Sequence, residues 1–555
     1  MTRYIISYRN PTQQFLTIEF QFEHLSQENP IVYLPTWRPG RYEIQHFAKR
    51  IRKVRASTSK GEALAIQKKG LSSWEIEASQ PQPICITYEY YAGLMDAGNT
   101  WLDEAQLYVN FINCLMYTAK SRETPCEVVL HLPDDYTVAS GLEKTEKHHL
   151  FAPNYNLLVD SPMFASNGLR QVVYGVNNRP YTLWFQGNMP QTDEALILDF
   201  SRFTKKTLEI MGDLPCDSYH FLFQILPYKH YHGVEHWNST VITIGPEEAL
   251  AERERYVDFL GVSCHELFHT WNVIRLRPQE MTPYDFQHPN VHQTGFITEG
   301  VTTYYGDLIL ARSGVYCFEE YMAEVNKLLK RHFENEGRQN YSVAESSFDL
   351  WLDGYEKGIP GRKVSIYNEG ALAAMILDLS IREKFDNRKS LDDVMRLMWA
   401  RHGQNMSGYT WEDYQKAAEE VFEGSLDSYF EQIIFGSADY GEWLFPLLQK
   451  FRLEVIDLSP ENQLEREFGF RSDEQIVYDI SEGSPAAHKL MLKDKVIQTN
   501  INEKQLHVTV ERQGKQHTIF LAKGAKEFFV IPQVSDSHVD IQNDLLRGWL
   551  EECVE

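Results

Sequence analysis

Apolar and polar residues alternate along the first part of the 555-residue chain. Residues 14–22 (QFLTIEFQF) and 84–91 (ICITYEYY) do so with a period of two. That period places one side chain in a core and the next in water, so each run predicts a half-buried strand. Residues 34–42 (LPTWRPGRY) combine turn residues with bulky aromatics. We therefore expect an all-β domain over residues 1–170, and we find no catalytic cluster in it.

The pattern changes near residue 171, where helical patterns join the strands. Residues 219–226 (YHFLFQIL) read as an apolar strand, and residues 192–212 ahead of them are a helix candidate. Residues 315–450 are rich in helical patterns, including strongly apolar runs. These features predict a mixed domain over residues 171–452 whose C-terminal part is helical.

A third pattern begins at about residue 453. Short strand candidates at residues 476–480, 506–512 and 517–521 are separated by turn residues. Such spacing predicts a small β-rich module over residues 453–555. The whole chain is therefore expected to have a multidomain α+β architecture.

The composition narrows the function. A formal net charge of -24 argues against nucleic acid or an anionic membrane as the main partner and leaves room for cationic ligands such as a peptide amino terminus. The seven cysteines are scattered and form no Cys-x-x-Cys pair, which is typical of reduced thiols in the cytosol. The sequence shows neither a signal-peptide pattern at its start nor an apolar run long enough to span a membrane, so we expect a cytoplasmic protein.

The candidate chemistry is concentrated in residues 263–272 (SCHELFHTWN). A helix there places His265 and His269 one turn apart on one face, with Glu266 beside them. Two neutral imidazoles can hold a zinc ion, and the adjacent carboxylate can take a proton from a bound water. The pattern is short and also arises by chance on helices with surface histidines, so other segments must support it. Cys264 points away from the metal face and is not an expected ligand.

Three residues outside this helix bear on the same site. Residues 296–310 show helical spacing and place Glu299 in a first turn, where it can complete a His₂Glu zinc site or merely complement the helix dipole; we favour the ligand. Glu235 lies in a Gly-Val-Glu segment of a candidate edge strand, where it could bind a substrate ammonium or be an ordinary strand-end carboxylate. Tyr367 could donate its hydroxyl to a reaction oxyanion or line a core.

These segments together resemble the M61 glycyl aminopeptidase family, gluzincin peptidases with a C-terminal PDZ domain. The resemblance covers essentially the whole chain and is carried by residues 34–42, 159–162 (VDSP), 265–278 (HELFHTWNVIRLRP) and 298–300 (TEG). It implies a thermolysin-like catalytic domain over residues 171–452 and a PDZ-like domain over residues 453–555.

The resemblance also implies roles for the residues left open above. Residues 233–236 (GVEH) are similar to the family's GLEH-type segment, whose glutamate anchors the substrate's free α-amino group, so Gly233 and Glu235 are expected to bind substrate. Tyr367 matches the tyrosine of a Tyr-x-Lys-Gly pattern that supports the transition state. Glu369 stands where that pattern has lysine, which changes the charge near Tyr367.

We therefore predict a zinc aminopeptidase with one Zn²⁺ per chain on His265, His269 and Glu299, and with Glu266 and Tyr367 as catalytic residues. Its substrates would be peptides with a free N-terminus and a small first residue such as Gly or Ala. One alternative is an endopeptidase or oligopeptidase with the same metal site; a less favoured one is an inert scaffold that binds partners through the PDZ-like domain.

The PDZ-like domain is the place for a further peptide or C-terminal ligand. Residues 490–495 (LMLKDK) replace the usual Gly-Leu-x-x-Gly-Asp there, which leaves such binding open. A homo-oligomer is compatible with the sequence, whereas nucleic acid and membranes are not expected partners.

Overall fold

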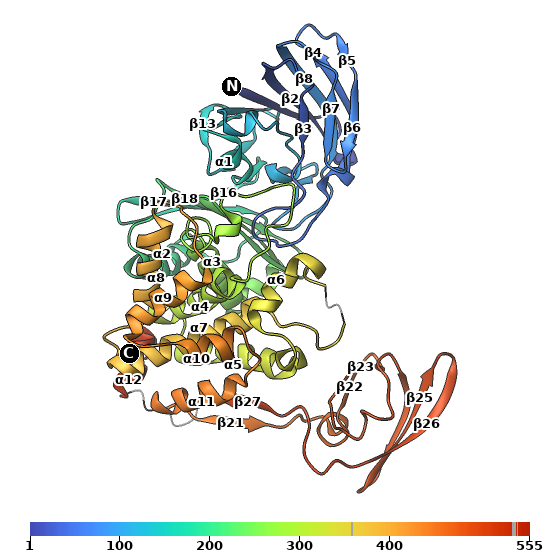
Figure 1. Cartoon of the computed structure of the whole chain (residues 1–555), viewed down its shortest axis with the longest axis vertical. Coiled ribbons are helices and arrows are strands. Elements are labelled where there is room, and N and C mark those ends of the chain that lie inside the picture. The colour runs from blue at the N-terminus through green and yellow to red at the C-terminus, as the bar shows by residue number, and fades with distance from the viewer. Residues whose placement is uncertain (357–358, 536–539, 541, 555) are drawn as a thin grey trace.

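The computed structural model describes residues 1–356, 359–535, 540 and 542–554. Three parts follow one another along the longest axis of the molecule, with the β-rich N-terminal part at one end and a small β-rich lobe at the other (Figure 1). A mixed part with most of the helices lies between them. The chain is thus multidomain α+β, as predicted.

The N-terminal domain consists of three β-sheets. Its largest sheet has the order β13 (Glu143–Glu146), β14 (His149–Ala152), β11 (Cys126–Leu130), β1 (Thr2–Tyr8), β2 (Phe15–His24), β8 (Gln82–Tyr91), β4 (Ile51–Thr58) and β5 (Ala63–Leu64). A second sheet orders β12 (Thr137–Ser140), β15 (Met163–Ser166), β10 (Gln106–Val109) and β9 (Trp101–Leu102), and a third orders β3 (Ile31–Tyr33), β7 (Ser73–Ile76) and β6 (Ile66–Gly70). The short helix α1 (Tyr155–Val159) precedes β15. The two alternating runs predicted as strands form β2 and β8, which pair antiparallel and bury one face in the core.

The central part begins with a mixed sheet of five strands. Their order is β16 (Arg170–Val176), β17 (Arg179–Gln186), β18 (Tyr219–Ile225), β20 (Ser239–Gly245) and β19 (His230–His236). β19 lies at one edge of this sheet, as proposed for the candidate edge strand, and it pairs antiparallel with β20. Its other long side has no strand partner among the described residues.

Helices follow and complete the central part. They are α2 (Asp193–Met211), α3 (Arg253–Phe268), the π-helix η7 (Phe296–Val301) that continues as α4 (Thr302–Arg312), α5 (Phe318–Glu334), α6 (Val343–Asp353), α7 (Ile366–Phe385), α8 (Leu391–Met398), α9 (Trp411–Phe422), α10 (Asp427–Tyr429) and α11 (Tyr440–Lys450). Helix α2 matches its prediction because the Thr192 side chain caps its first turn and Gly212 ends it. Among the described helices, none has the length and apolar composition needed to cross a membrane.

Helix α3 begins later than its residue pattern suggests. The pattern predicts a helix from Pro246, but residues 247–251 form a 3₁₀ turn and Glu252 is extended. The turn stays attached to the sheet because the Glu247 N–H donates to the Leu226 carbonyl at 2.9 Å. The α-helix can therefore start only once the chain has left this contact.

The C-terminal lobe has a sheet and a core of its own. The sheet orders β22 (Phe470–Asp473), β23 (Ile476–Ile480), β24 (Lys495–Ile501), β25 (Gln505–Arg512) and β26 (Lys515–Ala522). Its buried apolar side chains, among them Phe468, Val477 and Val508, form a cluster separate from the large core shared by the other two parts.

The last residues of the chain leave this lobe and return to the central part (Figure 1). β27 (Ile531–Val534) pairs with β21 (Val455–Leu458), and α12 (Asp544–Leu550) packs into the large core. The Trp549 side chain is fully buried, its indole N–H donates to the Tyr304 hydroxyl at 2.9 Å, and its carbonyl accepts from Arg312 at 2.9 Å. Within residues 453–555, predicted as one module, the five-stranded sheet thus forms the separate lobe, whereas α12 packs on the central part.

Candidate active site

Two histidines and a glutamate meet where α3 ends against η7. His265 lies in the last turn of α3, His269 follows its last residue, and Glu299 lies in η7, a π-helix of the kind often found at functional sites. The two His Nε2 atoms are 3.0 Å apart, and Glu299 Oε2 lies 3.8 Å from that of His265 and 3.4 Å from that of His269. The three predicted ligands are therefore brought together in the folded chain.

These distances suit a zinc ion. Ligand atoms about 2.0–2.1 Å from a tetrahedral zinc lie roughly 3.3 Å from one another. The two imidazole Nε2 atoms, 3.0 Å apart, are close enough to share a proton, and a cation bound between them can take the place of that proton. Three protein donors leave one position of a tetrahedral zinc open. The His265 side chain is 18% exposed and lines the adjoining cavity, so the open position can face that cavity.

Further contacts orient the ligands. His269 Nδ1 lies 2.8 Å from the Asn272 carbonyl, which fixes this nitrogen as the donor and turns Nε2 toward the cluster. The Asn272 amide in turn donates to the Ile297 carbonyl at 2.8 Å and thereby ties the end of α3 to η7. Glu299 Oε1 accepts a 2.8 Å hydrogen bond from the buried Tyr42 hydroxyl.

Tyr42 belongs to the N-terminal domain, in which the sequence showed us no catalytic cluster. Residues 34–42 nevertheless reach from this domain to the site. Gly40 has a φ of +74°, and a Cβ built there would lie 2.4 Å from Glu235 Oε2. The loop can therefore approach Glu235 only with glycine at this position. The turn and aromatic residues of this stretch were a signal, but nothing in the sequence showed what they contact.

Glu266 faces the same cavity from the middle of the site. It is only 4% exposed, and its Oε2 atom has no hydrogen-bond partner within the described residues. Gly233 on the free edge of β19 lies against it, since a Cβ there would come within 2.2 Å of Glu266 Oε1. Gly233 of the edge strand, the Glu266 carboxylate and His265 of the donor cluster thus line one cavity.

Glu235 lies two residues further along β19 and is 4% exposed. Its Oε1 atom also lacks a hydrogen-bond partner among the described residues. Burial raises the pKa of Glu235 to about 7, although the neighbouring His269 and Arg38 favour its charged form. A buried carboxylate with one oxygen left without a hydrogen-bond partner is a suitable receptor for an ammonium group.

Tyr367 reaches the site because two helices cross closely. A Cβ on Gly300 would lie 2.3 Å from the Cα of Gly370, so the glycine pair lets α7 contact η7 directly. Tyr367, in the first turn of α7, then lines the cavity with Tyr355, their hydroxyls 3.4 Å apart. Burial raises the pKa of Tyr367 well above its ordinary value, so its hydroxyl stays a proton donor. No pattern in the sequence pointed to Tyr355.

Glu369 is absent from this cavity. Its carboxylate accepts from His332 Nδ1 on α5 at 2.5 Å, and both side chains are buried. The Glu369 carboxylate is thereby held by a hydrogen bond to α5, and Tyr367 still lines the cavity.

The pKa values of the two histidines show that the cluster favours one positive charge, held on His269. Burial, helped by His269, lowers the pKa of His265 to about 3. Burial also acts to lower the pKa of His269, but the carboxylates of Glu299 and Glu235 outweigh it and raise this pKa to about 10. Metal ligands must be deprotonated, and a divalent cation would take the place of that proton. The pKa of Glu266 is raised well above its ordinary value by burial and by the other carboxylates, as suits a group that accepts a proton.

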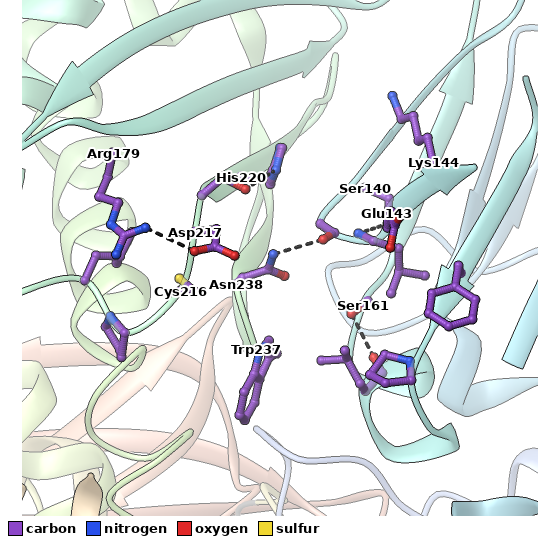
Figure 2. A pocket seen from close by; sticks show the side chains of 18 of the residues that line it. Ser140, Glu143, Lys144, Ser161, Arg179, Cys216, Asp217, His220, Trp237 and Asn238 are labelled. Carbon is purple, nitrogen blue, oxygen red and sulfur yellow. Dashed lines mark hydrogen bonds and ion pairs between the residues drawn. The ribbon is translucent and has the colours of Figure 1, made fainter. Parts of the chain in front are cut away.

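The cavity lined by Gly233, His265, Glu266 and Tyr367 has a volume of about 800 Å³. A larger cavity of about 1130 Å³ lies between the N-terminal domain and the start of β18, and Figure 2 shows its polar lining. His220, Asn238 and Arg179 point into it with Lys144 from the opposite wall. It contains none of the predicted site residues, so size alone does not identify the active site.

Comparisons with known proteins agree with this geometry. Residues 3–167 match the model of the Peptidase M61 N-terminal domain, and residues 258–373 match that of the M61 glycyl aminopeptidase; the two cover just over half of the chain. Comparison with the curated proteins gives no match.

Solved structures share the fold. An aminopeptidase N family protein from Idiomarina loihiensis has a TM-score of 0.89 at 24% identity, over 99% of this chain and 100% of its own. An M1 zinc metallopeptidase from Deinococcus radiodurans has a TM-score of 0.51 at 12% identity, over 79% of this chain and 94% of its own.

The architecture, the donor set and the matched models define an enzyme of the zinc aminopeptidase class. Its two matched regions belong to a single family. The chain is a member of the M61 peptidase family.

Proposed function

We propose that this enzyme removes small N-terminal residues, such as Gly or Ala, from peptides with a free N-terminus, using one Zn²⁺ held by His265, His269 and Glu299. The observation that carries the proposal is the meeting of three donor atoms at 3.0–3.8 Å beside the unpartnered carboxylate of Glu266. Bound there, zinc supplies a water of lowered pKa and polarises the scissile carbonyl.

The protein side chains account for the proton transfers. Glu266 accepts the proton of the attacking water, and its raised pKa then lets it pass that proton to the leaving amine. The Tyr367 hydroxyl donates to the carbonyl oxygen as negative charge develops on it. Tyr355 accepts or donates at 3.4 Å from that hydroxyl and so helps to orient it.

Glu235 supports an aminopeptidase over an endopeptidase. One oxygen of its buried carboxylate lacks a hydrogen-bond donor among the described residues, and the substrate's α-ammonium can supply one. The loop around Gly40 closes the space immediately beyond Glu235, which leaves little room for residues preceding the ammonium. The same closure favours a small first side chain, in agreement with the glycyl aminopeptidase description of the matched family.

The five-stranded C-terminal lobe is proposed to be PDZ-like. Residues 490–495 lack the usual glycine, yet Lys493 adopts the left-handed φ of +71° that a glycine would take. The Asp494 side chain accepts from the Met491 N–H at 2.9 Å and pairs with Arg512 at 2.6 Å, so the turn keeps its shape. Peptide binding by this lobe is a separate proposal that rests on the fold alone.

Two paired measurements test the proposal. Glycyl- and alanyl-p-nitroanilides should be hydrolysed faster than leucyl- or arginyl-p-nitroanilides, and a zinc chelator should abolish all activity until zinc is restored. Gly-Ala-Ala should be cleaved and its N-acetylated form should resist. Equal cleavage of the free and acetylated peptides would favour the endopeptidase alternative, and activity that persists in chelator would contradict the metal assignment.

A further inference from the structure

The active-site cavity continues past the metal-binding cluster. Its lining begins at Gly40, beside Glu235, and runs along the free edge of β19 as far as Tyr231. Beyond the cluster the walls come from α3, α4 and α5, and they include Asp307. The part of the cavity near Asp307 plays no role in the metal site or in the proton transfers described above.

The proposed function assigns this far end to the leaving peptide, and the inference rests on that function. A substrate whose ammonium is at Glu235 and whose scissile bond is at Gly233 and Glu266 must continue toward Tyr231. The free edge of β19 offers backbone groups to such an extended chain. The four residue-to-residue steps from Glu235 to Tyr231 span about 13 Å at roughly 3.3 Å per step, enough for the residues on both sides of the bond.

Asp307 lies at that end, about two helical turns beyond Glu299 along the same helix. Its Oδ1 would be 3.4 Å from a Cβ on Gly261, so it faces the segment of α3 one turn before His265. The side chain is half-buried, and within the described residues it makes neither a hydrogen bond nor an ion pair. Burial and the nearby Glu324 raise its pKa well above the ordinary value, against the opposing charges of Lys327 and Arg331.

The cations of this wall are already engaged elsewhere. Lys327 binds Glu324 at 2.7 Å and Asp258 at 3.5 Å. Arg255 binds the same Asp258 at 2.9 Å. Arg331 also lines the cavity, but it is exposed, so water screens its charge. Among the described residues, Asp307 is therefore the half-buried carboxylate of this wall that makes no ion pair; Glu254 makes none either, but it is exposed to water.

A second observation shows that the space is built for a ligand. Glu266 is 4% exposed, has an unpartnered Oε2 and faces the same cavity from the adjoining turn of α3. We propose that Asp307 forms the subsite for the first residue of the leaving peptide and selects a lysine or arginine side chain there. The buried parts of such a side chain would lie against Val262 and Tyr316, with its charged end at the carboxylate.

Competition between four tetrapeptides tests this assignment. They begin with glycine, end in Ala-Ala, and carry lysine, norleucine, glutamine or glutamate in second place. Norleucine matches the length of lysine without its charge. The full-length zinc-loaded enzyme should cleave the lysine peptide with a kcat/KM about tenfold above that of the norleucine peptide, since a partly buried ion pair is worth about one factor of ten.

Two variants assign the preference to Asp307. Asp307→Asn should reduce the lysine-to-norleucine ratio of kcat/KM to about one. Asp307→Lys should favour the glutamate peptide. Asp258→Asn is the matched control on the same wall: its carboxylate is already paired with Arg255 and Lys327, so the lysine preference should persist.

The outcomes separate this inference from the proposed function. If wild-type enzyme cleaves all four peptides equally, or if the preference survives in Asp307→Asn, the subsite assignment is overturned while the aminopeptidase stands. A wild-type preference for the glutamate peptide would assign the subsite to Arg331 and likewise overturn it. If none of the peptides is cleaved by zinc-loaded enzyme, the proposed function fails and the subsite with it.

Discussion

The hydroxyl of Tyr42 provides the sharpest test of how the N-terminal domain serves the metal site. Replacing Tyr42 by Phe removes one atom, the oxygen that donates to Glu299 Oε1 at 2.8 Å. The bond is buried and its acceptor is charged, and such bonds contribute about 1.5–3 kcal/mol. At about 1.4 kcal/mol per factor of ten, zinc affinity should fall by roughly 10- to 100-fold, the range usual for groups that orient a metal ligand.

Competition with a chelator of known zinc affinity measures this effect directly. Tyr88→Phe is the matched control, because Tyr88 is also fully buried and donates at 2.6 Å to the Cys114 carbonyl, away from the metal site. We expect the control to lower thermal stability while leaving zinc affinity unchanged. Zinc affinity in Tyr42→Phe within twofold of wild type would refute the role of Tyr42, as would an equal loss in the control.

Three further predictions concern separate features. Gly40→Ala should raise the KM for glycyl substrates at least tenfold with a smaller change in zinc affinity, because the new Cβ displaces Glu235; an unchanged KM would contradict the anchor. His220 is held neutral, since burial lowers its pKa to about 4 and its Nδ1 accepts from the Trp184 indole at 3.3 Å. Neutral His220 therefore stabilises the fold above its ordinary pKa of about 6.5, and this stabilisation is lost as the pH falls from there toward 4. His220→Gln should show a smaller drop in Tm between pH 7 and pH 5 than the wild type, by the equivalent of about 1 kcal/mol. Parallel curves of Tm against pH for the two proteins would contradict this prediction. Trp549→Ala should lower the free energy of unfolding by about 3–5 kcal/mol, seen as a lower Tm by calorimetry, whereas an unchanged Tm would mean that α12 does not stabilise the central core.

Local patterns in the sequence predicted the elements that depend on local physics. The period of two in β2 and the cap residues of α2 match the structure because pleating and capping act within a few residues. The start of α3 was misplaced for the opposite reason. A backbone hydrogen bond from Glu247 to the Leu226 carbonyl holds the preceding turn on the sheet, and no pattern within residues 246–253 encodes that contact.

The candidate site shows the same division. His265, His269 and Glu299 belong to two helices that follow each other closely, and their spacing was enough to propose them together. The Tyr42 hydroxyl reaches Glu299 across a separation of 257 residues, a contact that depends on how two domains pack. Tyr355 lines the cavity from a loop whose residues show no periodicity.

Charge patterns are equally hard to place without tertiary structure. Glu369 stands two residues from Tyr367, which suggested an altered electrostatic environment at the site. The structure instead pairs its carboxylate with His332 on another side of the helix. Likewise, the return of α12 to the large core depends on the burial of Trp549 against Tyr304, a partner 245 residues away. The sequence shows which chemical groups such residues carry, but not which partners their side chains contact in the folded protein.

The central claim is that zinc binds the three donors and that Glu266 moves the proton. One measurement on Glu266→Gln tests both parts: zinc content and glycyl peptide hydrolysis in the same sample. The substitution keeps the side chain's shape and leaves the three donors intact. We predict one zinc per chain, as in the wild type, with a kcat about 10²- to 10⁴-fold lower. A zinc-loaded Glu266→Gln enzyme with wild-type turnover, or wild-type enzyme that is active without zinc, would contradict the account.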